Sequence, residues 1–250
     1  MRKLMLLAAA VALVVAVPAI ADTKFGQTTQ TVDSKVTPSK AGTVKKPRGA
    51  SLYVKTATKN DDGSQPPVVS KAVITFPKEF SFNGKAFPFC TKGQLNDQGM
   101  LTACVKKGAQ VGSGSSVGQL GAAKPPFKIV AINGPGGNKV ELYIQGAPVN
   151  KALEGTLSGK NGQARKLTVP IPPEIQQAVP GTFASIAEFV TTVKKSIKVK
   201  GKTVNYFETT GCPKNKKWTV SGEFTVNSAA PASAGAPAKL TDKVDVPCTV

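Results

Sequence analysis

Apolar and polar side chains alternate along several short segments of this chain with a repeat of two residues. In the segment 139–144, Val140, Leu142 and Ile144 alternate with lysine, glutamate and tyrosine. The same alternation recurs over residues 52–57, 71–76 and 218–224, and less regularly over 127–132 and 165–169. Because successive side chains of a strand point to opposite faces of a sheet, this pattern predicts half-buried antiparallel strands.

Turn-forming residues separate these segments. The run 134–137, Gly-Pro-Gly-Gly, predicts a hairpin connection, and Gly201-Lys202 predicts a two-residue turn with glycine in the first central position. With 24 glycines and 19 prolines in the chain, no segment sustains a long amphipathic helix. Many short strands joined by turns predict an all-β fold, a single antiparallel two-sheet β-sandwich with long loops and two disulfides.

Four segments need a separate interpretation. Residues 92–97 and 172–178 are the best helical candidates. Residues 183–193 fit a helix as well as a strand, and we predict a strand. Residues 227–238 are rich in alanine, proline, serine and glycine and almost uncharged, so we predict a flexible loop there.

The first 21 residues have the three parts of a cleavable signal peptide. Arg2 and Lys3 precede an apolar run over residues 4–17, and Pro18 then leads to Ala19-Ile20-Ala21. The apolar run is shorter than the roughly 20 residues that a retained membrane anchor needs. We therefore expect cleavage after Ala21, no transmembrane anchor, and a secreted or extracytoplasmic product. Residues 22–48 form a polar N-terminal segment with a basic linker, and residues 49–250 form the β domain.

The expected mature chain is strongly basic. Loss of Arg2 and Lys3 leaves 31 basic residues against 14 acidic ones, a formal charge of +17. Only Arg48 and Arg165 of those cations are arginine. Lysine is a hydrated point charge, whereas arginine recognises phosphates and bases with two parallel hydrogen bonds. The composition therefore favours diffuse attraction to polyanions over specific nucleic-acid recognition, and surface solubility explains the charge equally well.

Four cysteines in an exported chain predict two disulfides, for which three pairings exist. We favour the local pairings, Cys90 with Cys104 and Cys212 with Cys248, because each closes a loop between neighbouring strands. The loop-entropy model gives each about 3–4 kcal/mol of stabilisation. The chain contains no histidine and no C-x-x-C spacing, so we expect no zinc site.

Four local patterns together resemble a group of uncharacterised exported proteins of high-GC Gram-positive bacteria. They are the segment 38–43, the cysteine-flanked loop 90–104, the glycine-serine stretch 111–118, and the run from Tyr206 through Cys212-Pro213 and Trp218 to Cys248. The resemblance covers most of the mature chain. It implies an exported β domain with two disulfides and brings no known activity and no functional residue.

The residue types argue against an enzyme. Without histidine there is no Ser–His–Asp or Cys–His nucleophile, paired cysteines leave no thiolate, and no serine has an S-x-x-K context. A pair of carboxylates remains, Glu141 with Glu208 or Glu223, as in glycosidases. All three are expected at outward-facing or strand-end positions beside lysines, where a solvated ion pair is the ordinary interpretation.

Two motifs match known ligand-binding loops only weakly. The stretch 111–118 has the spacing G-x-G-x-x-x-G, which is not the dinucleotide fingerprint, so we predict a surface loop. Asp61-Asp62-Gly63-Ser64 matches part of a calcium loop but lacks the later ligands, so we predict a turn between strands. We expect no cofactor and no metal.

The most suggestive functional feature is a set of lysines expected on neighbouring strands and their connection. On a strand, Lys198, Lys200 and Lys202 would share a face opposite Ile197 and Val199, which we expect in the core with Trp218, Val220 and Phe224. The candidate anion-binding set is Lys194, Lys195, Lys198, Lys200, Lys202, Lys214, Lys216 and Lys217.

Two hypotheses for function follow. The first is a non-enzymatic exported module that engages anionic cell-envelope material, such as wall polymers or lipid headgroups, through these lysines. The alternative is a carrier of an apolar or lipid ligand held between the sheets, because alternation does not distinguish a packed core from a cavity.

Overall fold

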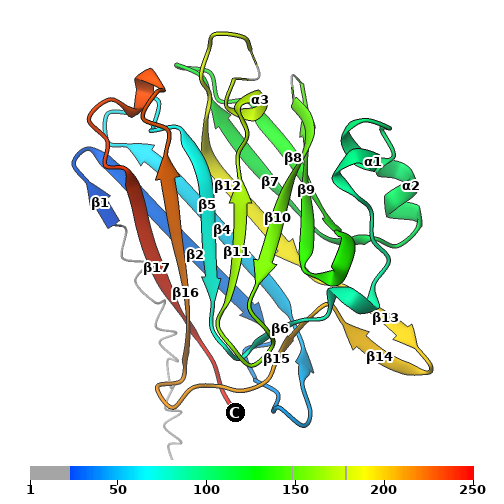
Figure 1. Cartoon of the computed structure of the whole chain (residues 1–250). Helices are drawn as coiled ribbons and strands as arrows, with labels where there is room; N and C mark the ends of the chain where they lie inside the picture. Colours follow the sequence, from blue (N-terminus) through cyan, green and yellow to red (C-terminus); the bar gives the residue numbers. More distant parts are fainter. Residues whose placement is uncertain (1–22, 148, 178) are drawn as a thin grey trace, which may run out of the picture.

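A computed structural model describes residues 23–147, 149–177 and 179–250 (Figure 1). The expected signal peptide, residues 1–21, lies outside this range. Within it the strands are β1 (Thr23–Phe25), β2 (Thr28–Thr37), β3 (Arg48–Gly49), β4 (Ser51–Asn60), β5 (Val69–Phe76), β6 (Phe80–Phe82), β7 (Gln110–Gln119), β8 (Pro126–Asn133), β9 (Lys139–Gly146), β10 (Val149–Ser158), β11 (Arg165–Pro170), β12 (Ser185–Val193), β13 (Ser196–Val199), β14 (Lys202–Asn205), β15 (Phe207–Thr209), β16 (Lys217–Val226) and β17 (Lys239–Pro247). The helices are α1 (Lys92–Asn96), α2 (Leu101–Lys106) and α3 (Pro173–Gln176), with 3₁₀ turns η1 (Gly84–Ala86), η2 (Pro135–Gly137) and η3 (Pro231–Ser233).

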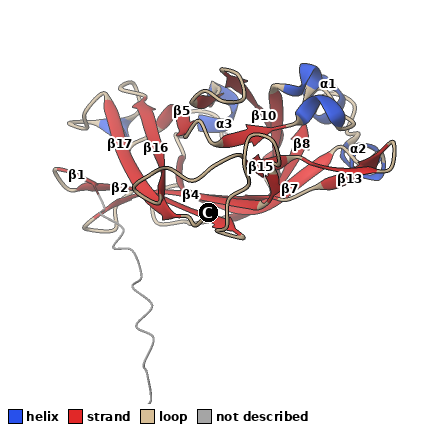
Figure 2. Cartoon of the chain, turned by 90° about the horizontal axis from the view of Figure 1, so that it is seen from below, coloured by secondary structure: helices blue, strands red, loops and turns tan. Residues whose placement is uncertain are grey.

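Twelve strands form one antiparallel sheet that curls into a nearly closed, barrel-like shape around an interior (Figure 2). Their order is β1-β2-β4-β12-β7-β8-β9-β10-β11-β5-β16-β17. The all-β prediction is confirmed, but the two-sheet sandwich is wrong, because the ladder of paired strands is continuous from β1 to β17. The alternation of side chains identifies a buried face without indicating whether that face belongs to one curled sheet or to two.

Asp242 joins the two ends of this sheet. It lies on β17, and its carboxylate accepts hydrogen bonds from the Val32 backbone N–H on β2 at 2.6 Å and from the Thr23 hydroxyl at 2.7 Å. Beyond the end of β17, the Ala41 N–H donates to the carbonyl of Thr249 at 2.8 Å. Residues 23–37 therefore contribute β1 and β2 to the same sheet as the residues that follow them.

An aromatic cluster fills one end of the interior. Phe80 lies 5.0 Å from Phe207 and 5.4 Å from Trp218 between ring centroids, both in edge-to-face contact. Phe80 and Phe207 belong to the small sheet β3-β15-β6. The predictions for β16 are confirmed, since Trp218 and Val220 are fully buried and Phe224 is 4% exposed.

The glycine-serine stretch 111–118 is a strand, so the predicted surface loop is wrong. It forms most of β7 and pairs with β8 on one side and β12 on the other. A Cβ atom on Gly114 would collide with the carbonyl oxygen of Val190, and one on Gly112 with that of Thr192. Glycine is therefore required at both positions because β12 approaches β7 so closely. Glycine is depleted in strands in general, which is why the sequence pattern predicts a loop here.

The helical predictions hold in part. Residues 92–97 contain α1, residues 172–178 contain the single turn α3, and α2 was not predicted. The ambiguous segment 183–193 contains β12, as expected. The loop 227–238 is packed rather than free, because the buried Ser233 hydroxyl accepts a hydrogen bond from the Val68 N–H at 3.0 Å. Among the described residues, no helix has the length and apolar character needed to cross a bilayer.

The hairpin β13–β14 corrects the predicted lysine face. Val199 pairs with Lys202, so the turn residues are Lys200 and Gly201, both with positive φ, and glycine takes the second central position. Lys202 therefore shares a face with Val199, while Lys198 lies on the other face and donates to the Thr203 hydroxyl at 2.8 Å. The core prediction is wrong here: Ile197 is half-buried and Val199 is 38% exposed.

Candidate functional site

The curled sheet forms a mainly apolar central cavity of about 150 Å³ that is partly open to solvent. Its walls come from β4 and β12 on one side and from β5, β9, β10 and β11 on the other. The side chains that line it are predominantly aliphatic and include Leu52, Val54, Ile74, Leu142, Leu153 and Val169.

The two-residue repeat of the strands creates this wall. On β4, Leu52, Val54, Thr56 and Thr58 line the cavity. The intervening Lys55 points to the outer face, where its Nζ lies 2.6 Å from a carboxylate oxygen of Glu188 on β12. The same alternation that predicts the strands therefore places an apolar surface inside and charged side chains outside.

Aromatic side chains line one end of the central cavity. Phe76, Phe82 and Tyr206 line it there, and the Phe76 and Phe82 ring centroids are 5.3 Å apart. Burial raises the pKa of Tyr206 to about 12, so its phenol is neutral at physiological pH. This end of the cavity therefore presents rings and no ionised group from these three residues.

A smaller end cavity of about 70 Å³ lies toward α3. It is lined by Phe127, Ile144, Val149 and Ile175 among others. Ile186 of β12 lines both cavities. The two spaces are therefore neighbours within one barrel-like interior.

The polar residues of the central wall are three threonines, Tyr206, Asn138 and Lys139, whose ammonium lies 2.8 Å from Glu154. The Thr58 hydroxyl donates to Gln30 Oε1 at 2.7 Å. The Thr191 hydroxyl is buried without a hydrogen-bond partner among the described residues. No group of three His, Cys, Asp or Glu side chains in the described part of the chain could hold a metal ion. The cavity wall is thus mainly apolar, with a few polar side chains.

Glu141 differs from its prediction. It was expected on an outward, solvated position, but it is fully buried on β9 beneath the lobe formed by α1 and α2. Burial, together with the nearby charge of Glu154, raises the pKa of Glu141 to about 7. The three glutamates considered as a catalytic pair are not brought together, because Glu208 accepts from Asn83 and Asn205 on β15 and Glu223 pairs with Lys239 on β16.

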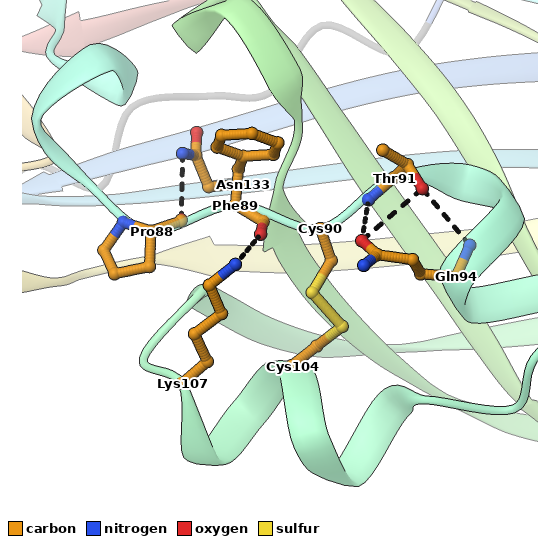
Figure 3. Close-up of a disulfide and its surroundings, with 8 residues drawn as sticks. All are labelled: Pro88, Phe89, Cys90, Thr91, Gln94, Cys104, Lys107 and Asn133. Carbon is orange, nitrogen blue, oxygen red and sulfur yellow. Dashed lines mark hydrogen bonds between the residues drawn. A yellow bond between two sulfur atoms is a disulfide. The ribbon is translucent and has the colours of Figure 1, made fainter.

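The disulfide Cys90–Cys104 holds that lobe (Figure 3). Thr91 begins α1 with a capping box, since its hydroxyl accepts from the Gln94 N–H at 3.2 Å and Gln94 Oε1 accepts from the Thr91 N–H at 2.9 Å. The Asn133 amide of β8 donates to the Pro88 carbonyl at 3.1 Å. The second disulfide joins Cys212 to Cys248, so both bonds link the pairs favoured from the sequence.

The eight candidate lysines do not form one patch. Lys195 is half-buried and the others are exposed. The hairpin β13–β14 and the connection that carries Lys214 and Lys216 to β16 lie on opposite sides of the molecule (Figures 1 and 2). Among the described residues, Lys217 is the one member with an ion pair, to Asp245 at 3.5 Å.

Comparison of the chain with models of protein families finds no match, and comparison with curated protein sequences finds none. The resemblance to exported proteins of high-GC Gram-positive bacteria therefore stays a prediction. Sequence reasoning anticipated a ligand space only as an alternative and missed the burial of Glu141. No pattern in the sequence signals either feature, because side chains alternate in the same way beside a cavity and in a packed core.

Proposed function

We propose that this protein binds an apolar ligand inside its barrel-like sheet and has no catalytic role. The observation that carries the proposal is the central cavity of about 150 Å³ with a predominantly aliphatic wall. Water against an apolar wall is poorly ordered, so an apolar occupant that displaces it gains affinity. Well-packed interiors have few voids larger than one water molecule, which makes this space unusual for a purely structural core.

The disulfides fit the same proposal. Two disulfides are typical of proteins that work in an oxidising, extracytoplasmic compartment. An apolar molecule that crosses such an aqueous compartment needs a protein interior to shield it. Export with signal-peptide cleavage after Ala21 is accordingly part of the proposal.

Filling the cavity tests it. Ala131 on β8 is fully buried and lines the cavity, so Ala131→Leu adds bulk to the space that the ligand would take. The matched control is Ala57→Leu, which adds the same atoms on β4 between Thr56 and Thr58, two cavity-lining residues, and hence on the outer face. We expect a fluorescent apolar probe to bind the parent and Ala57→Leu and to lose at least tenfold in affinity for Ala131→Leu. Equal binding by all three proteins would place the probe elsewhere and contradict the proposal.

A second candidate function is attachment to anionic cell-envelope material. It is favoured by the exposed lysines of the β13–β14 arm, Lys198, Lys200 and Lys202, which have no carboxylate partner among the described residues. The test is cosedimentation with cell-wall material at low and high salt. Retention at low salt that is lost at high salt supports it, and retention that ignores salt contradicts it.

A further inference from the structure

The shape of the central cavity narrows the class of ligand. Along β4 the lining residues run from Leu52 to Thr58, and along β12 from Ile186 to Val193. At about 3.3 Å per residue these stretches are roughly 20 Å long. The cavity of about 150 Å³ is therefore drawn out along the strands. A similar volume gathered into a compact chamber would hold about one benzene-sized ring.

An elongated apolar space suits a thin occupant. A volume of about 150 Å³ spread over roughly 20 Å leaves a narrow cross-section, whereas a fused-ring molecule needs width. A single hydrocarbon chain needs length and contacts aliphatic side chains along its whole course. The proposed function then takes a specific form, in which one straight chain lies parallel to the strands.

A β-bulge turns Ile186 toward the interior, where such a chain would lie. In a regular strand, residues three apart face opposite sides of the sheet. The pairing of β12 with β7 shifts register between Ile186 and Glu188, and as a result both Ile186 and Phe189 face the interior. Bulges commonly re-aim a side chain next to a site. Ile186 is the side chain that lines both the central cavity and the end cavity of about 70 Å³.

We propose that the ligand is a single unbranched hydrocarbon chain, of the fatty-acyl type, and that Ile186 sets the longest chain that binds. This inference rests on the proposed apolar-ligand function. A chain that ends before Ile186 fits the central cavity alone. A longer chain meets the isoleucine and enters the end cavity only when that side chain is smaller.

A series of straight-chain alcohols of increasing length, each titrated against a bound fluorescent apolar probe, tests the inference. For the parent we expect affinity to rise about fourfold per added methylene and then to stop rising at a definite length. Ile186→Ala should move that length to longer chains while leaving the affinity for short chains within about twofold. Ile171→Ala is the matched control, because Ile171 lines only the central cavity and loses the same atoms. It should leave the limiting length unchanged.

The outcomes separate the two proposals. If no alcohol displaces the probe from the parent, the apolar-ligand function itself is wrong. If alcohols bind but Ile186→Ala keeps the limiting length of the parent, the role of Ile186 is wrong. If a sterol binds more tightly than every straight chain, the ligand class is wrong. Ile186→Val, which removes one methylene, repeats the test with a smaller shift should the alanine variant not fold.

Discussion

Glu141 on β9 and Glu154 on β10 are direct cross-strand partners in unlike surroundings. Glu154 is half-buried and lies 2.8 Å from the Lys139 ammonium. Glu141 is fully buried, and as a carboxylate it has no hydrogen-bond donor among the described residues. Burial, together with the nearby charge of Glu154, raises the pKa of Glu141. Glu141 therefore keeps its proton to a higher pH than an ordinary glutamate does.

Glu141→Gln should remove a pH dependence of stability. The pKa of Glu141 is raised in the folded state to about 7, from an ordinary value of 4.5. Between these values the unfolded chain has released the proton and the folded protein has not, so stability falls as pH rises. The loss is about 3 kcal/mol, complete above the folded pKa and absent below the unfolded pKa.

Urea unfolding of the parent and Glu141→Gln at pH 4 and pH 8 measures this difference. We expect similar stabilities at pH 4 and a more stable variant at pH 8, by about 2–3 kcal/mol. Glu223→Gln is the control and should not gain stability at pH 8, because it removes a surface carboxylate that is paired with Lys239 and does not face Glu141. If the free energies of unfolding of the parent and Glu141→Gln differ by the same amount at both pH values, Glu141 is not the titrating group.

Asp242→Ala should open the seam between β17 and β2. The substitution removes the acceptor of the Val32 N–H and of the Thr23 hydroxyl, and the Val32 amide is then buried without a partner. We expect a loss of about 2–3 kcal/mol in the free energy of unfolding. Asp245→Ala on the same strand removes a carboxylate that is 46% exposed and should cost less than about 1 kcal/mol. Equal losses in denaturant melts would argue against a seam held by Asp242.

Thr191→Val should stabilise the protein by about 1 kcal/mol. Its buried hydroxyl has no partner among the described residues, and the valine keeps nearly the same shape without a polar atom to desolvate. Thr58→Val makes the same change in the same wall but breaks the 2.7 Å hydrogen bond to Gln30, so it should destabilise by about 1–2 kcal/mol. The melting temperatures of the two variants should therefore shift in opposite directions from that of the parent. A lower melting temperature for both variants would imply that the Thr191 hydroxyl has a hydrogen-bond partner.

The predicted strands follow from side-chain alternation, and this signal is strong where one face meets the core. β16 shows it best, with Trp218, Val220 and Phe224 buried in sequence order. On β13 the same alternation fails, because the hairpin projects from the barrel and Val199 has no core to enter. Alternation therefore predicts strands more reliably than it predicts burial.

The cavity and the buried glutamate were beyond sequence reasoning for a physical reason. Leu52 lines the cavity and Val32 lies in the packed core, yet both are inward-facing residues of their strands. What differs is the distance from each side chain to the opposite wall of the barrel-like sheet, which the sequence does not show. The alternation predicts that Glu141 faces outward, and its side chain does lie on the outer face of the sheet. The α1–α2 lobe covers that part of the outer face, so Glu141 is buried. The local disulfide pairings were predictable, because Cys90 and Cys104 are 14 residues apart in sequence.

Replacing Lys198 and Lys200 together by serine should leave the free energy of unfolding within about 0.5 kcal/mol of the parent, because both side chains are exposed. Phe224→Ala, by contrast, should cost about 3–5 kcal/mol, since the ring is buried on the interior face of β16. Denaturant melts compare the two. A lysine variant less stable than Phe224→Ala would contradict the orientation of these strands. A stable lysine variant that still sediments with wall material would exclude the arm as the anionic contact.

Native mass spectrometry of the protein purified from its own cells measures directly whether the interior is occupied. We expect a species heavier than the bare chain with two disulfides, an added mass that disappears after solvent extraction, and an extract that contains a straight-chain lipid. Incubation of the extracted protein with a straight-chain alcohol should restore a one-to-one adduct, and Ala131→Leu should fail to form it. A purified protein found only at its bare mass, and unchanged after incubation with the alcohols, would contradict the proposal that this barrel-like sheet encloses a ligand.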